Sequence, residues 1–379
     1  MSKTLSVPAS PKRNLVLDVF RGMTVCFMII VNTPGNGDTT FSPLHHAAWN
    51  GFTPTDLVFP SFLFAVGNSM SFVMKKWETW STQHVVWKIL KRTAIIFLLG
   101  YLMYWFPFFR LDKDHHFYWY PMSGTRIMGV LQRIALCYGI ASLMIYFLKE
   151  RATVIICVIL LFVYWILLYM FGDPAQPLSM QGNAGFYFDR WLMGENHMYH
   201  GEGVAFDPEG WLSTLPAISN AVGGYLVGKW IQKKGDYEGI IKLLLWGFAL
   251  MVGGYFWDLL FPINKKLWTS SFVVYTIGID CVIIGLLVYF IQLRGKEKWT
   301  HFFQVFGKNT LFIYLLSELL ATILYTIPAG SDNLFRWFYG NIFSHAGDYP
   351  GSLLFALAYM LVCWSAGCWL DKRKIYIKV

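Results

Sequence analysis

The chain has 379 residues, of which 56% are hydrophobic and only 14% are charged, and its mean hydropathy is +0.45. These values argue against soluble domains and predict one transmembrane domain over residues 1–379, with the lipid bilayer as its main partner. The formal net charge is +9. Because the Lys and Arg residues cluster between apolar segments and form no basic stripe interleaved with aromatic residues, we expect no nucleic-acid partner.

Ten apolar segments are long enough to cross a bilayer, which takes roughly 20 residues per helix. We therefore predict an all-α polytopic membrane protein with about ten transmembrane helices. In chain order the predicted spans are Leu15 to Thr33, Asp56 to Met74, Val86 to Phe106, Arg126 to Leu148, Ala152 to Phe171, Trp211 to Ile231, Gly239 to Leu260, Leu267 to Leu293, Phe302 to Ile327 and Ser352 to Leu370. The first span carries Asp18 and Arg21 and precedes no small-x-small cleavage site, so we expect it to be retained rather than removed as a signal.

The basic residues fall mainly on one side of these spans. If the amino terminus is cytoplasmic, the cytoplasmic segments, including Lys3, Lys12 and Arg13, hold 22 of the 31 Lys and Arg residues, and the opposite segments hold seven. This bias follows the positive-inside rule and predicts that both termini are cytoplasmic. The opposite, outer side then receives seven of the nine histidines, in the pairs His45/His46 and His115/His116 and at three single positions.

Charged residues inside the spans are costly in lipid and need partners. Asp18 and Arg21 lie three residues apart and either neutralise each other, or leave Arg21 to meet an anion from the cytoplasm. Arg133 lies near mid-span with no acidic residue at helical spacing, so it requires a partner from another helix, such as Asp18, or a ligand.

Four polar residues at the outer ends of spans have simpler interpretations. Asn32, before Pro34 and Gly35, fits a helix terminator, and Asp56 fits an N-cap. Asp258 and Glu318 are candidates for lining a substrate pocket.

His46 has the most reactive surroundings in the chain. Trp49, the turn at Asn50 and Gly51, and an immediate return into the membrane favour a pocket around it. A zincin-like HExxH spacing is absent and the six cysteines lie in apolar segments without a Cys-x-x-Cys pair, so we expect no metal. A neutral imidazole that accepts a proton is the better use of this residue.

Several stretches, spread from one end of the chain to the other, resemble one known family. They are LDVFRGM from Leu17, Val31–Asn32, HAAWNGFTPTDLVFPSFLFAVGNSM from His46, GVLQRIALCYG from Gly129, FDPEGWLSTLPAI from Phe206, INKKLWTSSFV from Ile263, GKNTLFIYLLSEL from Gly307 and the basic end KRKIYIKV. The chain resembles the heparan-α-glucosaminide N-acetyltransferase family of transmembrane acetyltransferases, in a short form like its bacterial members.

The resemblance implies transfer of an acetyl group from cytoplasmic acetyl-CoA to the amine of a glucosamine-type sugar beyond the membrane. It also implies a bacterial inner-membrane location and a homodimer. His46 matches the catalytic histidine of the family and Asn32 its companion asparagine. Whether the histidine acts as general base or as acetyl acceptor stays open.

The same chemistry predicts the remaining site residues. Asn32 or the Trp49 indole is expected to stabilise the oxyanion, with Asn50, Asp56, Asp258 and Glu318 around the acceptor. The nucleotide of acetyl-CoA cannot cross hydrocarbon, so we expect it near inner basic residues. The candidates for that path are Arg21 with Asp18, Arg133, Lys308 and Asn309.

Two other functions fit the sequence. A sugar transporter or exporter would use the polar residues within the spans to line a substrate path, although no inverted repeat is evident. An O-acetyltransferase acting on envelope polysaccharide would keep the chemistry and change the nucleophile.

Overall fold

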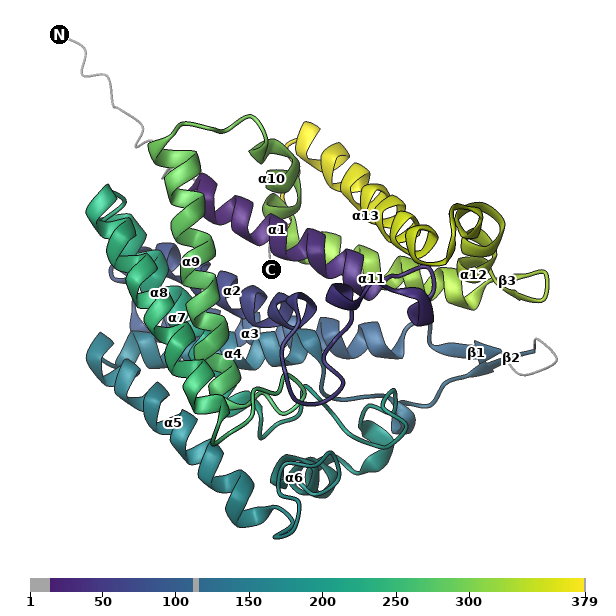
Figure 1. Cartoon of the computed structure of the whole chain (residues 1–379), viewed down its shortest axis with the longest axis horizontal. Helices are drawn as coiled ribbons and strands as arrows, with labels where there is room; N and C mark the ends of the chain where they lie inside the picture. The colour runs from purple at the N-terminus through teal and green to yellow at the C-terminus, as the bar shows by residue number, and fades with distance from the viewer. Residues whose placement is uncertain (1–13, 112–115, 378–379) are drawn as a thin grey trace.

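A computed structural model describes residues 14–111 and 116–377 of the chain (Figure 1). The basic residues Lys3, Lys12 and Arg13, and His115 of the second histidine pair, lie outside these residues.

The described part is almost wholly helical, which confirms the all-α prediction. A long helix, or in one case a helix pair, coincides with each predicted span. The long helices are α1 (Leu15–Asn32), α2 (Val58–Trp77), α3 (Thr82–Trp105), α4 (Val130–Phe147), α5 (Glu150–Phe171), α7 (Thr214–Lys233), α8 (Tyr237–Asp258), α9 (Ser270–Val288), α11 (Thr310–Thr326) and α13 (Asp348–Lys372). The shorter helices are α6 (Ala184–Met193), α10 (Thr300–Lys308) and α12 (Leu334–Phe338). Two antiparallel hairpins, β1 (Phe109–Leu111) with β2 (Phe117–Trp119) and β3 (Pro328–Ala329) with β4 (Asp332–Asn333), and several short 3₁₀ and π helices are also present.

Length and composition support fewer membrane crossings than the ten predicted spans. Among the described residues, seven helices are long and apolar enough to cross a membrane, or eight if α10 and α11 form one span. Helices α3 and α7 fall short because α3 carries Lys88, Lys91 and Arg92, and α7 carries Ser219 and Asn220. The prediction of ten crossings therefore stays a prediction.

The ninth predicted span is not one straight helix. It breaks at Asn309, and α10 and α11 meet at 82°. Asn309 is 1% exposed, and its side chain donates to the carbonyl of Ile375 (3.0 Å) and accepts from the amide of Ile377 (2.9 Å). The carboxyl-terminal segment thus satisfies the buried side-chain amide at the break.

Glycines bring the central helices into close contact. A Cβ at Gly67 of α2 would lie 1.8 Å from the carbonyl oxygen of Ala221 in α7, and one at Gly224 would lie 1.9 Å from that of Phe64. A Cβ at Gly22 of α1 would likewise lie 1.8 Å from a carbonyl oxygen of α10. Small residues at these crossings allow backbones to approach closely, as in membrane helix packing.

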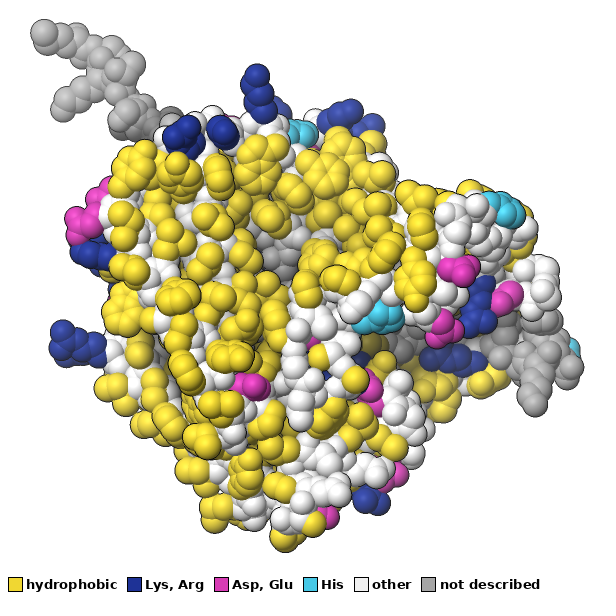
Figure 2. Space-filling view, viewed as in Figure 1, with side chains coloured by type: hydrophobic (Ala, Val, Ile, Leu, Met, Phe, Trp, Pro, Cys, Tyr) yellow, Lys and Arg dark blue, Asp and Glu magenta, His cyan; other side chains and the backbone are white. Residues whose placement is uncertain are grey.

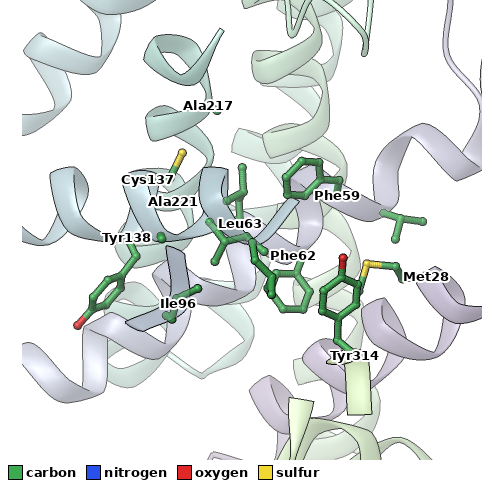
Figure 3. Close-up of a cluster of buried hydrophobic side chains, with 14 of the residues drawn as sticks. Met28, Phe59, Phe62, Leu63, Ile96, Cys137, Tyr138, Ala217, Ala221 and Tyr314 are labelled. Carbon is green, nitrogen blue, oxygen red and sulfur yellow. The ribbon is translucent and has the colours of Figure 1, made fainter. Parts of the chain in front are cut away.

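The bundle has two dissimilar ends and an apolar flank. We call the end that carries the loops 33–57, 106–129, 172–213, 259–269 and 327–347 the loop end, and the opposite end, where α1 begins, the basic end. Helices α5 and α8 lie on the outside of the bundle, with only 22% and 28% of their apolar windows buried, against 72% for α2. Figure 2 shows the resulting flank as an almost continuous hydrophobic surface, as a lipid-facing side requires. Inside, buried side chains such as Met28, Phe62 and Tyr314 interlock between α1, α2 and α11 (Figure 3).

Candidate functional site

His46 lies at the loop end, in the long connection between α1 and α2. Its Nδ1 atom is 2.6 Å from Oδ1 of Asp56, which belongs to the 3₁₀ turn Pro54–Leu57 at the start of the second predicted span. The imidazole side chain is 43% exposed, whereas the carboxyl side chain is 1% exposed. The His46 ring is therefore accessible to a substrate, while the Asp56 carboxylate that orients it is buried.

Asp56 also organises the loop that carries the histidine. Its Oδ2 accepts from the backbone amides of Ala47 (3.1 Å) and Thr53 (2.9 Å) and from the Thr53 hydroxyl (3.0 Å). The prediction that Asp56 is the N-cap residue was wrong: Thr53 is the N-cap of this turn, and Asp56, three residues later, completes a capping box with it. Because both oxygens are occupied and buried, the geometry favours an orienting role for Asp56 over direct contact with substrate.

The hydrogen bond to Asp56 selects the tautomer of His46. A carboxylate only accepts, so Nδ1 carries a proton, and in the neutral imidazole Nε2 keeps its lone pair. In the part of the chain that the structure describes, no hydrogen-bond partner occupies Nε2. An oriented imidazole with an available Nε2 is the arrangement that a general base or a nucleophile needs.

Trp49 and Asn50 fasten the same loop to its neighbours. The Trp49 indole donates to the carbonyl of Leu178 (2.9 Å), and Asn50 accepts from the side-chain amide of Asn264 (3.1 Å). The indole N–H that was considered as an oxyanion donor is thus already used. Both residues hold the loop at the site rather than reaching into it.

Asp258 supports the loop from a greater distance. Its Oδ1 accepts from the amide of Ile263 (2.6 Å), whose carbonyl in turn accepts from the amide of Gly51 (2.8 Å). Its interactions are those of a residue that shapes the turn after α8.

Asn32 and Glu318 come together, as their positions at the loop ends of α1 and α11 allow. The Asn32 amide lies 3.4 Å from Oε1 of Glu318, and Asn32 is exposed. Within the described ranges no hydrogen bond joins Asn32 to His46. The predicted catalytic pair is thus two pairs, His46 with Asp56 and Asn32 with Glu318.

Arg133 lies closer to the loop end than its place in the predicted span suggested, because α4 begins only at Val130. It is fully buried, donates to the carbonyl of Gly210 (3.0 Å) and to the Ser213 hydroxyl, and faces the ring of Trp268. The predicted partner, Asp18, is therefore wrong: the Arg133 guanidinium contacts Gly210 and Ser213 of a loop-end segment and the ring of Trp268.

A second buried charge cluster adjoins this segment. Arg126 binds Asp207 (2.7 Å) and Glu209 (2.6 Å), and Lys265 lies 3.6 Å from Glu209. Burial alone would raise the pKa of the Glu209 carboxyl, but its basic neighbours outweigh burial and lower that pKa to about 2. The cluster cross-links three loops at the loop end.

All four predicted residues at the basic end have partners within the protein. Asp18 and Arg21 form an ion pair, as the first of their two interpretations predicted. Lys308 donates to both carboxyl oxygens of Asp371 at 2.9 Å, beside the tail contacts of Asn309. Their role toward a nucleotide stays a prediction.

A cavity runs through the bundle between α1, α2, α3, α4 and α11. Along α2 its lining extends from Trp77 at the basic end to Phe62 near the loop end, and Arg21 and Arg92 contribute guanidinium groups. Figure 3 shows Phe62, Ile96 and Tyr138 of this lining among the core side chains.

Buried polar atoms of three lining residues that the sequence did not predict have no hydrogen-bond partner in the described residues. They are the Trp77 indole nitrogen, the Tyr138 hydroxyl and Nε of Arg92. Unsatisfied buried donors are costly and indicate that a ligand or water completes the cavity. The sequence analysis missed all three residues, although Arg92 gave a signal, because it lies inside a predicted span.

Metal ligands do not gather in the residues that the structure describes, where no three His, Cys, Asp or Glu side chains meet. Five of the six cysteines are buried and all are free.

The fold and these sites define a class: a helical membrane protein with an oriented histidine at one end and a central cavity lined by buried polar atoms. The family model described as "Heparan-alpha-glucosaminide N-acetyltransferase, catalytic" matches residues 13–190. The mouse (Mus musculus) protein named heparan-alpha-glucosaminide N-acetyltransferase is 25% identical, in an alignment covering 98% of this chain and 61% of that protein. Its human (Homo sapiens) counterpart is also 25% identical, with 99% and 61% covered.

These matches confirm the resemblance seen in the sequence. The chain spans about 61% of the length of either relative. The family model covers His46, Asp56, Asn32 and Arg92, while Glu318 lies beyond it.

Proposed function

We propose that this protein is a membrane-bound N-acetyltransferase that moves an acetyl group from acetyl-CoA to the amine of a glucosamine-type sugar. The observation that carries the proposal is the His46–Asp56 pair, which leaves Nε2 exposed at the loop end. The similarity to enzymes named for this reaction supports the same choice.

His46 removes a proton from the acceptor amine as the amine attacks the acetyl thioester. The new N–C bond forms, the C–S bond breaks, and the proton passes from His46 to the departing thiolate, so that N-acetyl sugar and free thiol result. A positioned imidazole contributes about 10² to 10⁴ in rate as a general base. If His46 instead accepts the acetyl group, the same Nε2 atom is the nucleophile.

Asn32 is the better-placed of the two oxyanion donors considered, because Trp49 donates to Leu178. The long 3.4 Å contact to Glu318 holds its amide weakly. A good donor at this position contributes roughly 3 kcal/mol to stabilisation of the transition state.

The central cavity is the proposed place for the acetyl donor. Arg21 and Arg92 would bind phosphate groups, and Trp77 and Tyr138 would hydrogen-bond the amide-containing arm that carries the thioester. The unpartnered polar atoms of the cavity fit such a ligand.

The loop end is proposed to face the outside of a bacterial inner membrane, with both termini in the cytoplasm. The bias of 22 basic residues against seven supports this orientation. The acceptor then arrives from the outer side and acetyl-CoA from the cytoplasm.

Purified protein in liposomes, labelled acetyl-CoA and a panel of amino sugars test the proposal by mass spectrometry of the products. We expect acetylated glucosamine from the wild-type protein and a loss of about 10² or more with His46→Ala. His45→Ala is the matched control, since His45 is also exposed but binds the Thr40 carbonyl (3.1 Å). Full activity of His46→Ala would falsify the mechanism.

The same panel separates the other two functions. Acetylation of N-acetylglucosamine would indicate an O-acetyltransferase, because its amine is blocked. Uptake of sugar into sealed vesicles without acetyl-CoA would indicate a transporter.

A further inference from the structure

A second hollow opens at the loop end, separate from the central cavity. It has a volume of about 510 Å³, and Asn32 lies in its wall. The other walls are the loop 34–38, Tyr325 at the end of α11, and α12 with the residue after it, Tyr339. We call this hollow the aromatic groove; α12 and the neighbouring hairpin mark its place in Figure 1.

The walls of the aromatic groove are held in place from behind. The loop is tied to α13 through Ser352, whose carbonyl accepts from the amide of Gly35 (3.2 Å) and whose hydroxyl binds both backbone groups of Asn36 (3.0 and 3.1 Å). On the other side, Phe335 is 1% exposed and stacks on Tyr325 with ring centroids 4.3 Å apart. Such fixed walls lower the entropic cost of binding a ligand.

The lining combines flat rings with a few charged groups. Tyr325 is 51% exposed, and Tyr339 is partly exposed. Asp38 has no side-chain partner within the described residues, and Arg336 makes one ion pair, with Asp332 at 3.2 Å, while remaining 67% exposed. Rings that cover the faces of a ligand and a small number of polar groups at its edge are typical of sites for small polar molecules.

This combination matches one chemical class. A sugar ring offers apolar C–H faces to tyrosine rings, and its hydroxyl oxygens accept from a guanidinium. An amino sugar adds an ammonium group, for which a free carboxylate is the complement. Asn32 belongs both to this groove and to the proposed catalytic residues, so a ligand in the groove lies beside one of those residues.

We propose that the aromatic groove is the acceptor subsite: Tyr325 and Tyr339 contact the sugar ring, Arg336 binds its hydroxyl groups, and Asp38 binds its ammonium group. This assignment rests on the proposed function, because an acceptor subsite presupposes acetyl transfer. Sugar binding itself can be measured without turnover. Asp38 would then be the residue that distinguishes a free amine from an N-acetylated one.

Binding is measured by calorimetry or saturation-transfer NMR on the full chain carrying His46→Ala, with glucosamine and N-acetylglucosamine as probes. Adding Asp38→Asn should weaken glucosamine binding about tenfold and leave N-acetylglucosamine binding unchanged, and adding Tyr339→Ala should weaken both about tenfold. Tyr187→Ala and Arg190→Gln are matched controls, because both side chains are exposed on α6, another loop-end element. Absence of glucosamine binding, or binding that the groove variants leave intact, overturns the assignment.

A smaller change, Gly35→Ala, tests the groove in case the other groove variants fail to fold. A Cβ at Gly35 would lie 2.3 Å from the Tyr339 ring, so Gly35→Ala should displace that ring without removing it. In active protein it should raise KM for glucosamine severalfold with little change in kcat. Normal binding in the groove with no acetylated product would refute the proposed function alone, and acetylation with KM unaffected by the groove variants would refute the subsite alone.

Discussion

At the residue scale, the proposed reaction depends on how Asp56 holds His46. In Asp56→Asn, an N–H₂ group replaces one of the two carboxylate oxygens. In one orientation of the amide it faces the amides of Ala47 and Thr53, and in the other it faces the ring of His46, so one set of hydrogen bonds is lost. We expect Asp56→Asn to lower kcat by about 10² or more, because the imidazole loses its orientation and tautomer. Acetylation kinetics measure the effect.

The control for this variant is Asp173→Asn, at an exposed loop-end aspartate that accepts from the amide of Ala175 (2.8 Å). It should retain wild-type kcat. An unchanged kcat in Asp56→Asn with normal folding would show that the pair is structural.

Arg92 is the second residue with a specific consequence. Its Nε has no partner in the described chain, and its guanidinium lies over the ring of Tyr138, in the lining of the central cavity. Arg92→Gln should raise KM for acetyl-CoA about tenfold or more, since hydrogen bonds to charged groups contribute about 1.5–3 kcal/mol, and leave KM for the sugar unchanged.

Steady-state kinetics with each substrate varied in turn measure this split. Lys88→Gln is the matched control on α3, because Lys88 lies over the Trp80 ring outside the cavity lining. An equal rise in both KM values would argue against a donor site at Arg92.

At the element scale, the break between α10 and α11 depends on Asn309. Its two hydrogen bonds to the tail are buried, so Asn309→Ala should lower the free energy of unfolding by about 1–3 kcal/mol and release residues 373–377. Thermal unfolding in detergent and limited proteolysis of the tail measure both effects. Asn341→Ala, which removes one exposed hydrogen bond to Trp337 (2.9 Å), should change neither.

Helix α6 makes the stability of the loop end depend on pH. Its Asp189 is 3% exposed, and burial raises the pKa of this carboxyl from 3.8 to about 7, although the amide of Trp211 partly opposes the shift. A raised pKa means that the folded state binds the proton more tightly than the unfolded state. The contribution of Asp189 to stability is therefore full below about pH 4 and declines as the pH rises through about 7.

Melting temperatures between pH 5 and pH 8 measure this decline. Each unit of pKa shift corresponds to roughly 1.4 kcal/mol in the free energy of unfolding. Asp189→Asn keeps an acceptor for Trp211 and should flatten the profile. Asp173→Asn should leave the slope of melting temperature against pH unchanged. A wild-type slope in Asp189→Asn would show that other groups cause the pH dependence.

At the scale of the whole molecule, the proposed orientation can be tested by labelling. A cysteine at Tyr187, exposed at the loop end, should react with a membrane-impermeant maleimide in intact cells, whereas a cysteine at Lys296, exposed at the basic end, should react only after lysis. The reverse pattern would invert the topology. The native background is low because five of the six cysteines are buried.

Much of the architecture was predictable because it depends on local properties. Apolar length placed a helix at each predicted span, and the motif around His46 indicated the resemblance to a family whose model matches residues 13–190. The capping box of Thr53 and Asp56 is also a local feature, since it joins residues three positions apart, although the sequence-based prediction placed the N-cap at Asp56 instead of Thr53.

Other features arise only when distant segments meet. Asn32 and Glu318 are 286 positions apart, the cavity takes Arg21, Arg92 and Tyr138 from three helices, and the groove joins the loop 34–38 to residues 325–339. The 82° break was hidden as well, because the sequence around Asn309 is apolar enough for a continuous helix and the tail that stabilises the break comes from 66 positions later. The sequence by itself determined which segments form the long apolar helices, and it led to the proposal that His46 is the reactive histidine, since hydrophobicity and short motifs are local. The tertiary structure alone decided which partners those residues have, because burial and hydrogen bonding depend on neighbours that sequence distance does not reveal.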